Sequence, residues 1–142
     1  MLHRPSYLER LADLATRIER ARGMTDHLMG DVIEMACYRF AAPDNLHEAN
    51  RIRRLMRTGA WIDAALALIE LELPQWSLRC VARENGQWRC VLGREPLVAD
   101  WLDETIRSED AALPLALLAA FVEAVRLSAE ARVPISQALI KA

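Results

Sequence analysis

Residues 60–95 read AWIDAALALIELELPQWSLRCVARENGQWRCVLGRE, and the spacing of the apolar side chains changes within this stretch. Before its last turn, the segment 60–73 has only two polar residues, Asp63 and Glu70. They are seven positions apart and therefore lie on one narrow stripe of a helix. A helix that is apolar nearly all round packs on several sides. This segment therefore predicts a central helix over 60–73, ended by Pro74.

The segments 76–84 and 87–95 are rich in residues that favour strands, and they flank the dipeptide Asn85-Gly86. Asn-Gly between two such segments is a strong signal for a two-residue hairpin turn. The hairpin would pair Arg83 with Trp88, Val81 with Cys90 and Arg79 with Leu92. Arg83 over the Trp88 ring would contribute roughly 0.5–1 kcal/mol if exposed. Because an isolated hairpin is only marginally stable, we expect it to pack on helices or to gain a strand.

Three helices are predicted before this stretch from the apolar spacing. The first covers about 6–21 and stops at Gly23, the second runs from Thr25 to Pro43, and the third runs from 44 or 45 to Gly59. Asn45 and Glu48 resemble a capping box at the start of the third helix. A single helix that continues through Gly23 is the alternative for the first two.

After the hairpin, a short helix is predicted from the spacing of Val98, Trp101, Leu102 and Ile106. A last long helix is predicted over 114–130, with Pro134 closing it. The sequence therefore predicts an α+β fold that is predominantly helical, with about six helices and one β-hairpin in the order αααα–ββ–αα.

The chain has 142 residues, of which 53 % are hydrophobic and 27 % charged, and its formal net charge is −2. We expect a single domain over 1–142, with a core that needs neither a metal nor a disulfide. Cys37, Cys80 and Cys90 include no Cys-x-x-Cys pair, which indicates three reduced thiols. No segment resembles a signal peptide or a membrane span. We therefore expect a cytoplasmic protein that contacts no membrane and uses no cofactor.

One candidate site lies on the second predicted helix. His27, Asp31, Glu34 and Tyr38 fall at i, i+4, i+7 and i+11, on one helix face. A histidine between two carboxylates suits a divalent cation, or an imidazole base that Asp31 orients. The spacing reproduces no His-Glu-x-x-His motif, and a solvated helix face has the same pattern. A small metal-dependent or acid–base enzyme is therefore an alternative, with no metal or catalytic residue assigned.

A second candidate site lies on the predicted helix 44–57, where four arginines fall within seven residues: Arg51, Arg53, Arg54 and Arg57. Glu48 is the only acid between 45 and 58. The helix dipole stabilises cations only in the last turn, so some of these arginines need a carboxylate or phosphate from elsewhere.

The expected sources of that negative charge are acidic residues of the same or a second subunit, or an acidic surface on a protein partner. The candidate acidic residues lie in the stretch 100–110 and are Asp100, Asp103, Glu104, Glu109 and Asp110. Nucleic acid bound along the helix 44–57 is the alternative.

The remaining features favour binding over catalysis. Among the four tryptophans, we expect Trp61 and Trp88 to contribute to a partner surface, because tryptophan is enriched at binding hot spots. The nucleotide-binding motifs GxGxxG and GxxxxGK[ST] and the nucleophile motif GxSxG are absent from the sequence. By elimination, the sequence predicts a non-catalytic protein-interaction or regulatory accessory subunit.

We also expect this subunit to form a two-fold homodimer. One small domain can surround one nearly all-apolar helix but struggles to surround both 60–73 and 114–130. The hairpin adds edges that are open to pairing.

Overall fold

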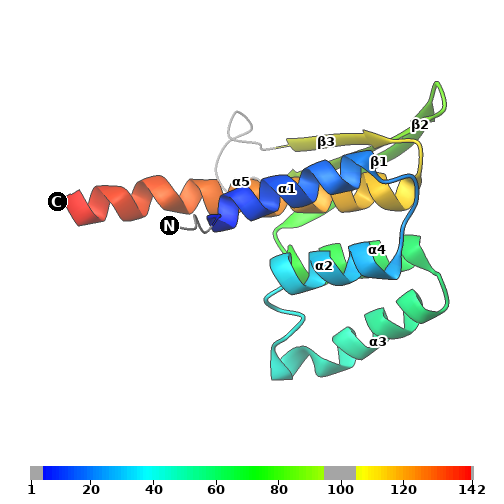
Figure 1. Cartoon of the computed structure of the whole chain (residues 1–142), viewed down its shortest axis with the longest axis horizontal. Coiled ribbons are helices and arrows are strands. Elements are labelled where there is room, and N and C mark those ends of the chain that lie inside the picture. The colour runs from blue at the N-terminus through cyan, green and yellow to red at the C-terminus, as the bar shows by residue number, and fades with distance from the viewer. Residues whose placement is uncertain (1–4, 95–104, 142) are drawn as a thin grey trace.

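The structure is a computed structural model that describes residues 5–94 and 105–141. In chain order, its elements are α1 (Tyr7–Arg20), α2 (Asp26–Ala36), the 3-10 turn η1 (Pro43–Asn45), α3 (Leu46–Arg57), α4 (Trp61–Glu72), β1 (Trp76–Glu84), β2 (Gln87–Arg94), β3 (Thr105–Asp110) and α5 (Leu113–Lys141). The described residues thus form five α-helices and three strands (Figure 1), an α+β fold that is mainly helical.

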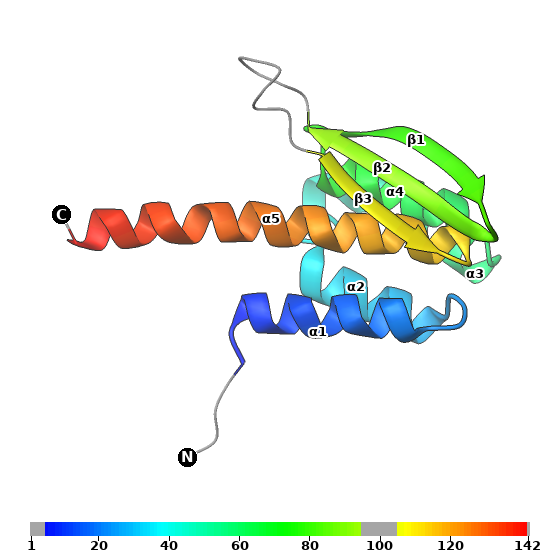
Figure 2. The same ribbon diagram turned by 90° about the horizontal axis from the view of Figure 1, so that it is seen from above.

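The three strands form one antiparallel sheet in the order β1-β2-β3, and the helices cover one of its faces. Helix α5 packs against β2 and β3, and α4 packs against β1 (Figure 2). Helix α1 lies along α5, and α3 packs on α4 at the far end of the fold from the sheet (Figure 1). Cys90, Leu92 and Ile106 are buried on the covered face of the sheet.

The central helix is α5 rather than α4, which corrects the expectation from the sequence. Helix α5 contacts α1, α2, α4, β2 and β3. Its first half is buried almost completely, at Leu115, Ala116, Leu117, Leu118, Ala120, Phe121, Val122 and Ala124. Each large apolar side chain buried in this way stabilises the fold by roughly 1.5–3 kcal/mol. The fold therefore surrounds the first half of this helix.

The first two helices are separate, as the stop signal at Gly23 indicates, and the alternative of one continuous helix is wrong. Helix α1 begins with a capping box, in which the backbone N–H of Glu9 donates to Ser6 Oγ at 3.1 Å. The Ser6 backbone N–H in turn donates to the Glu9 carboxylate at 3.4 Å. Thr25 caps α2 in a similar way, by accepting the backbone N–H of Leu28 at 3.1 Å.

Helix α2 ends at Ala36, before the predicted stop at Pro43, because a distant side chain holds the following backbone. The carboxylate of Glu72, at the end of α4, accepts the backbone N–H groups of Arg39 at 3.0 Å and Phe40 at 2.6 Å. These two donors are therefore satisfied without a further helical turn. Phe40 is buried in the core from this loop.

The predicted capping box at the start of α3 is absent, whereas the predicted end of α3 at Gly59 is confirmed. Asn45 makes no capping bond to the helix, because its side-chain amide donates to the Arg39 carbonyl oxygen at 2.9 Å. Gly59 follows α3 with φ +74°, and the N–H groups of Gly59 and Ala60 donate to the carbonyls of Met56 and Leu55. This is a Schellman motif, which places a left-handed residue just after a helix.

The hairpin is present with the predicted turn, and its register is correct only near the turn. Asn85 and Gly86 both have positive φ, as a type I′ turn requires. The predicted pairs of Val81 with Cys90 and Arg83 with Trp88 form, and the Arg83 guanidinium carbon lies 5.7 Å from the centre of the Trp88 ring. A β-bulge between Leu78 and Cys80 then shifts the register. Leu92 pairs with Leu78 rather than with Arg79, so that predicted pair is wrong.

The short helix predicted after the hairpin is wrong where the structure describes it, because Ile106 lies on strand β3. Strand β3 pairs with β2 from Gly93 opposite Thr105 to Trp88 opposite Asp110. Ile106 is buried on the covered face and Ser108 donates to the Ala116 carbonyl of α5 at 2.6 Å. Val98, Trp101 and Leu102 lie outside the described residues.

The last helix is longer than predicted and continues through residue 134 to Lys141. A proline removes one backbone donor, yet its fixed φ is compatible with a helix, so the helix can resume after it. Both views show this end of α5 extending beyond the rest of the fold (Figures 1 and 2). Among the described residues, no helix has the length and apolar character to cross a membrane.

Replacing Gly59 with alanine is expected to destabilise the protein by about 1–2 kcal/mol, because a Cβ disfavours the left-handed conformation. No atom lies within 4 Å of the added Cβ, so the backbone alone sets this cost. Gly23→Ala is the matched control, since its Cβ also meets open space and its φ is outside the left-handed region. Urea denaturation measures both variants. Equal stability of the two variants would contradict the role of Gly59.

Candidate functional site

The four arginines of α3 are exposed, but they differ in their partners. Arg51 lies 3.7 Å from the Glu48 carboxylate, with both side chains about half exposed. The Arg53 guanidinium carbon lies 4.8 Å from the centre of the Phe40 ring, and its side chain donates to Asn50 Oδ1 at 3.1 Å. Within the described part of the chain, the side chains of Arg54 and Arg57 have no ion pair or hydrogen bond.

The acidic residues of the C-terminal third do not neutralise these arginines where the structure describes them. Glu109 and Asp110 lie on β3, at the opposite end of the fold from α3 (Figure 1). Asp110 instead accepts the backbone N–H of Ala112 at 3.0 Å, just before α5 begins. The other three candidates, Asp100, Asp103 and Glu104, lie outside the described residues.

Two carboxylates of α4 lie beside Arg51 of α3. Asp63 and Glu70 are exposed on the outer stripe of α4, and neither has an ion pair or hydrogen bond within the described residues. Together with Arg51, they line a hollow of about 460 Å³ whose apolar wall includes Leu66 and Trp76. Arg51 also lines an adjoining hollow with Arg54. We call the residues Arg51, Arg54, Asp63, Leu66 and Glu70 the α3–α4 surface.

The two candidate tryptophans lie in different places. Trp61 is partly buried at the start of α4, where it lines a small hollow of about 260 Å³ with Asp63 and the exposed Ile62. It therefore adjoins the α3–α4 surface through Asp63. Trp88 lies on the sheet, beside Arg83 and away from that surface. The structure brings Trp61 beside Asp63 and places Trp88 on the sheet.

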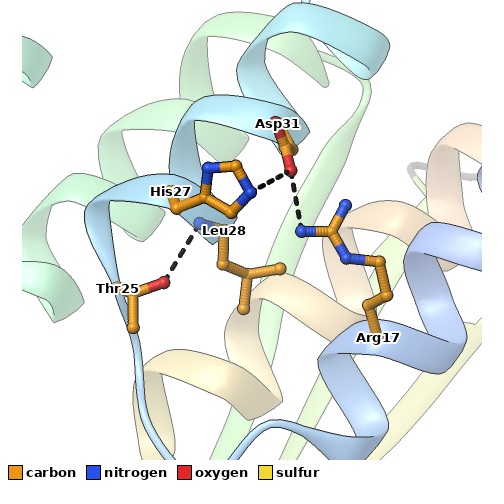
Figure 3. A network of polar contacts seen from close by, with 5 residues as sticks. All are labelled: Arg17, Thr25, His27, Leu28 and Asp31. Carbon is orange, nitrogen blue, oxygen red and sulfur yellow. Dashed lines mark hydrogen bonds and ion pairs between the residues drawn. The ribbon is translucent and has the colours of Figure 1, made fainter.

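The His27 face brings together only two of its four predicted residues. His27 Nε2 lies 3.5 Å from Asp31 Oδ2, and Arg17 from α1 reaches the same oxygen at 2.7 Å (Figure 3). Glu34 is exposed and Tyr38 lies beyond the end of α2, where it is 72 % exposed. Among the described residues, no three His, Cys, Asp or Glu side chains are grouped closely enough to hold a metal ion. The Asp31 carboxylate serves the contact between α1 and α2.

A further site was not predicted from the sequence. Glu72 lines a cavity of about 400 Å³ with Tyr7, Tyr38 and residues of α5. Burial raises the pKa of Glu72 above its ordinary value, and the backbone N–H groups of Arg39 and Phe40 oppose this shift only in part. Burial and the neighbouring Tyr38 phenol raise the pKa of Tyr7. The one sequence signal was a glutamate in the last turn of an almost wholly apolar helix.

The free energy of unfolding is expected to depend on pH through Glu72. A glutamate in an unfolded chain has a pKa of about 4.3. The Glu72 carboxyl group of the folded protein keeps its proton to higher pH. The folded state binds the Glu72 proton more tightly than the unfolded state does, and this difference stabilises the fold below the pKa of the unfolded glutamate. The stabilisation is lost as the pH rises through the higher pKa of Glu72 in the folded state. The stability of the wild type relative to Glu72→Gln should fall over that interval. Denaturant unfolding at several pH values measures this difference, and parallel pH profiles would contradict it.

Comparison with known proteins finds no match: no protein-family model, no curated protein and no solved structure matches this chain. Its function is therefore inferred from its own surfaces and cavities. The α3–α4 surface and the cavity beside Glu72 each combine charged side chains with a hollow of ligand size. Another hollow, of about 470 Å³, is lined by Arg17, Arg20, Arg22 and His27.

Proposed function

We propose that the chain is a self-associating protein-interaction subunit, and that its homodimer forms through the α3–α4 surface. The observation that carries this proposal is that Arg51 of α3 lines one hollow with two unpaired carboxylates of α4, Asp63 and Glu70, and a second hollow with the unpaired Arg54. A two-fold axis brings the same patch of both subunits together. A patch with a positive half and a negative half is then complementary to itself.

The shape and polarity of the surface support the same proposal. The hollow between the charges has an apolar wall that includes Leu66 and Trp76. Ile62, which is 42 % exposed, lines the neighbouring hollow with Asp63. Apolar centres with a charged rim are typical of protein interfaces. The exposed charges contribute specificity and association rate, and the apolar wall contributes burial.

The same surface disfavours the alternative of a nucleic acid along α3. Asp63 and Glu70 lie beside the arginines and would repel the phosphates that those arginines attract. Nucleic-acid binding also has a distinct signature, because the affinity would fall steeply with salt, with a slope near one per phosphate contact.

The double variant Arg51→Ala/Arg54→Ala is expected to weaken the dimer by about tenfold or more, because exposed ion pairs contribute about 0.2–1 kcal/mol each and the two-fold axis repeats every loss. Neither residue is buried, so the variant should fold normally. Light scattering over a dilution series measures the dissociation constant. A wild type that stays at the 16.1 kDa of one chain at micromolar concentration would overturn the proposal.

A charge exchange tests the pairing itself. Arg51→Glu/Arg54→Glu and Asp63→Arg/Glu70→Arg should each be monomeric alone, because like charges then meet across the axis. Mixing the two variants should restore a dimer, since each supplies the charge that the other lacks. Arg107→Glu, at an exposed position of β3, is the control and should dimerise like the wild type. Failure of the mixture to associate would contradict this surface.

A further inference from the structure

The connection between α1 and α2 borders a hollow that the proposed dimer does not use. Its volume is about 470 Å³, which is within the range of small-molecule sites. Arg17 and Arg20 line it from the last turn of α1. Arg22 lines it from the connection, and His27 from the first turn of α2. The hollow shares no residue with the α3–α4 surface, so ligand binding and dimer formation can be tested separately.

The charged side chains that line this hollow are all basic. Within the described residues, no carboxylate forms part of its wall. Asp31 lies next to it on α2, where its Oδ2 accepts from Arg17 at 2.7 Å and lies 3.5 Å from His27 Nε2 (Figure 3). This carboxylate neutralises Arg17, and it leaves the other two arginines of the hollow without a counter-charge.

Those two arginines are the charges that a ligand would meet. Arg20 and Arg22 are exposed, and neither has an ion pair or hydrogen bond to another described residue. The other acids of this region, Glu19 and Asp26, do not line the hollow and pair with neither arginine. A guanidinium group presents its donors as a planar fork that matches two oxygens of one phosphate group. The wall is therefore suited to an anion.

The start of α2 favours the same sign of ligand charge. Thr25 caps this helix through the Leu28 N–H, but the N–H groups of Asp26 and His27 have no acceptor within the described part of the chain. The amino end of a helix carries a partial positive charge, which attracts anions and repels cations. His27 and the preceding arginines therefore lie where an anion would compensate the side chains and the helix dipole together.

We propose that this hollow binds a small phosphate monoester, a phosphate dianion that carries a compact apolar group. Arg20 and Arg22 would pair with the phosphate oxygens, and the amino end of α2 would contribute its dipole. A phosphate group alone fills only part of the hollow. Ala21 and Leu28 belong to the same wall and offer apolar contact to the rest of the ligand.

Three probes separate the charge of the ligand from its apolar group: phenyl phosphate, inorganic phosphate and phenol. Each is titrated into the ¹⁵N-labelled full chain up to about 10 mM, because a small fragment binds weakly. The ionic strength is held constant, since salt screens exposed charges. The pH is about 7.5, above the second pKa of a phosphate monoester, which is about 6.

The amide signals of Gly23 and Thr25 are the reporters, since both residues line the hollow. Phenyl phosphate is expected to shift them in a saturable way. Inorganic phosphate should bind at least threefold more weakly, because it lacks the apolar group. Phenol should bind at least tenfold more weakly, because it lacks the charge.

Two variants and a matched control test the contacts. Arg20→Gln and Arg22→Gln each remove one charge and should weaken phenyl phosphate binding by about three- to tenfold, because a charge-assisted hydrogen bond is lost. Both side chains are exposed, so the variants should fold like the wild type. Arg10→Gln removes the same charge from an exposed position of α1 outside the hollow, and it should bind like the wild type.

Four results would each overturn the proposal. Phenol that binds as tightly as phenyl phosphate would show that the hollow selects an apolar group and no charge. Inorganic phosphate of equal affinity would show that the organic part is not recognised. An equal loss of affinity in Arg10→Gln and in the two hollow variants would show attraction by the overall charge of α1. No saturable shift at Gly23 and Thr25 would show that the hollow takes no phosphate monoester.

Discussion

The burial of the first half of α5 is the constraint on which the rest of the fold depends. Residues 115–124 place apolar side chains on almost every side of this helix. The helix must therefore be covered on several sides rather than on one. The sheet covers it through β2 and β3, α1 covers another side, and α4 and α2 complete the enclosure.

The Glu72 carboxylate is a polar group that also holds distant parts of the fold together. It fixes the backbone of residues 39 and 40 from the end of α4, and so determines where α2 stops and where Phe40 enters the core. The same bonds leave a hollow between this loop, α1 and α5. The two hydrogen bonds to Glu72 thus help to shape this cavity.

The sequence was most informative where structure depends on near neighbours. The Asn85-Gly86 turn and the end of α3 at the left-handed Gly59 follow from a few adjacent residues, and both are present. The capping box predicted at Asn45 is absent, because the Asn45 amide donates to the carbonyl of Arg39. Strand β3 reads TIRSED, and its one apolar residue, Ile106, also fitted a helical spacing. Pairing with β2 and cover by α5 decide its conformation, and neither is visible in a six-residue segment.

The candidate site likewise has features that the sequence could predict and features that depend on tertiary packing. The exposure of the arginines of α3 could be predicted from the helical period, whereas their neighbours on α4 depend on how two helices pack. Asp63 and Glu70 were recognised as one stripe, but their position beside Arg51 is a tertiary property. Glu72 was missed because its partners lie more than thirty residues away along the chain.

The two outer strands of the sheet have a consequence for how copies of this protein meet in a crowded solution. Within the described residues, β1 and β3 each have one edge without a neighbouring strand, and such edges are templates for aggregation. Here β1 carries a bulge at Arg79, and β3 carries Arg107, Glu109 and Asp110 within six residues. Bulges and charges of this kind hinder the stacking of strands into fibres. Because the sheet edges are protected in this way, we expect ordered contacts between copies to form on the helical side of the molecule, where they do not extend a sheet.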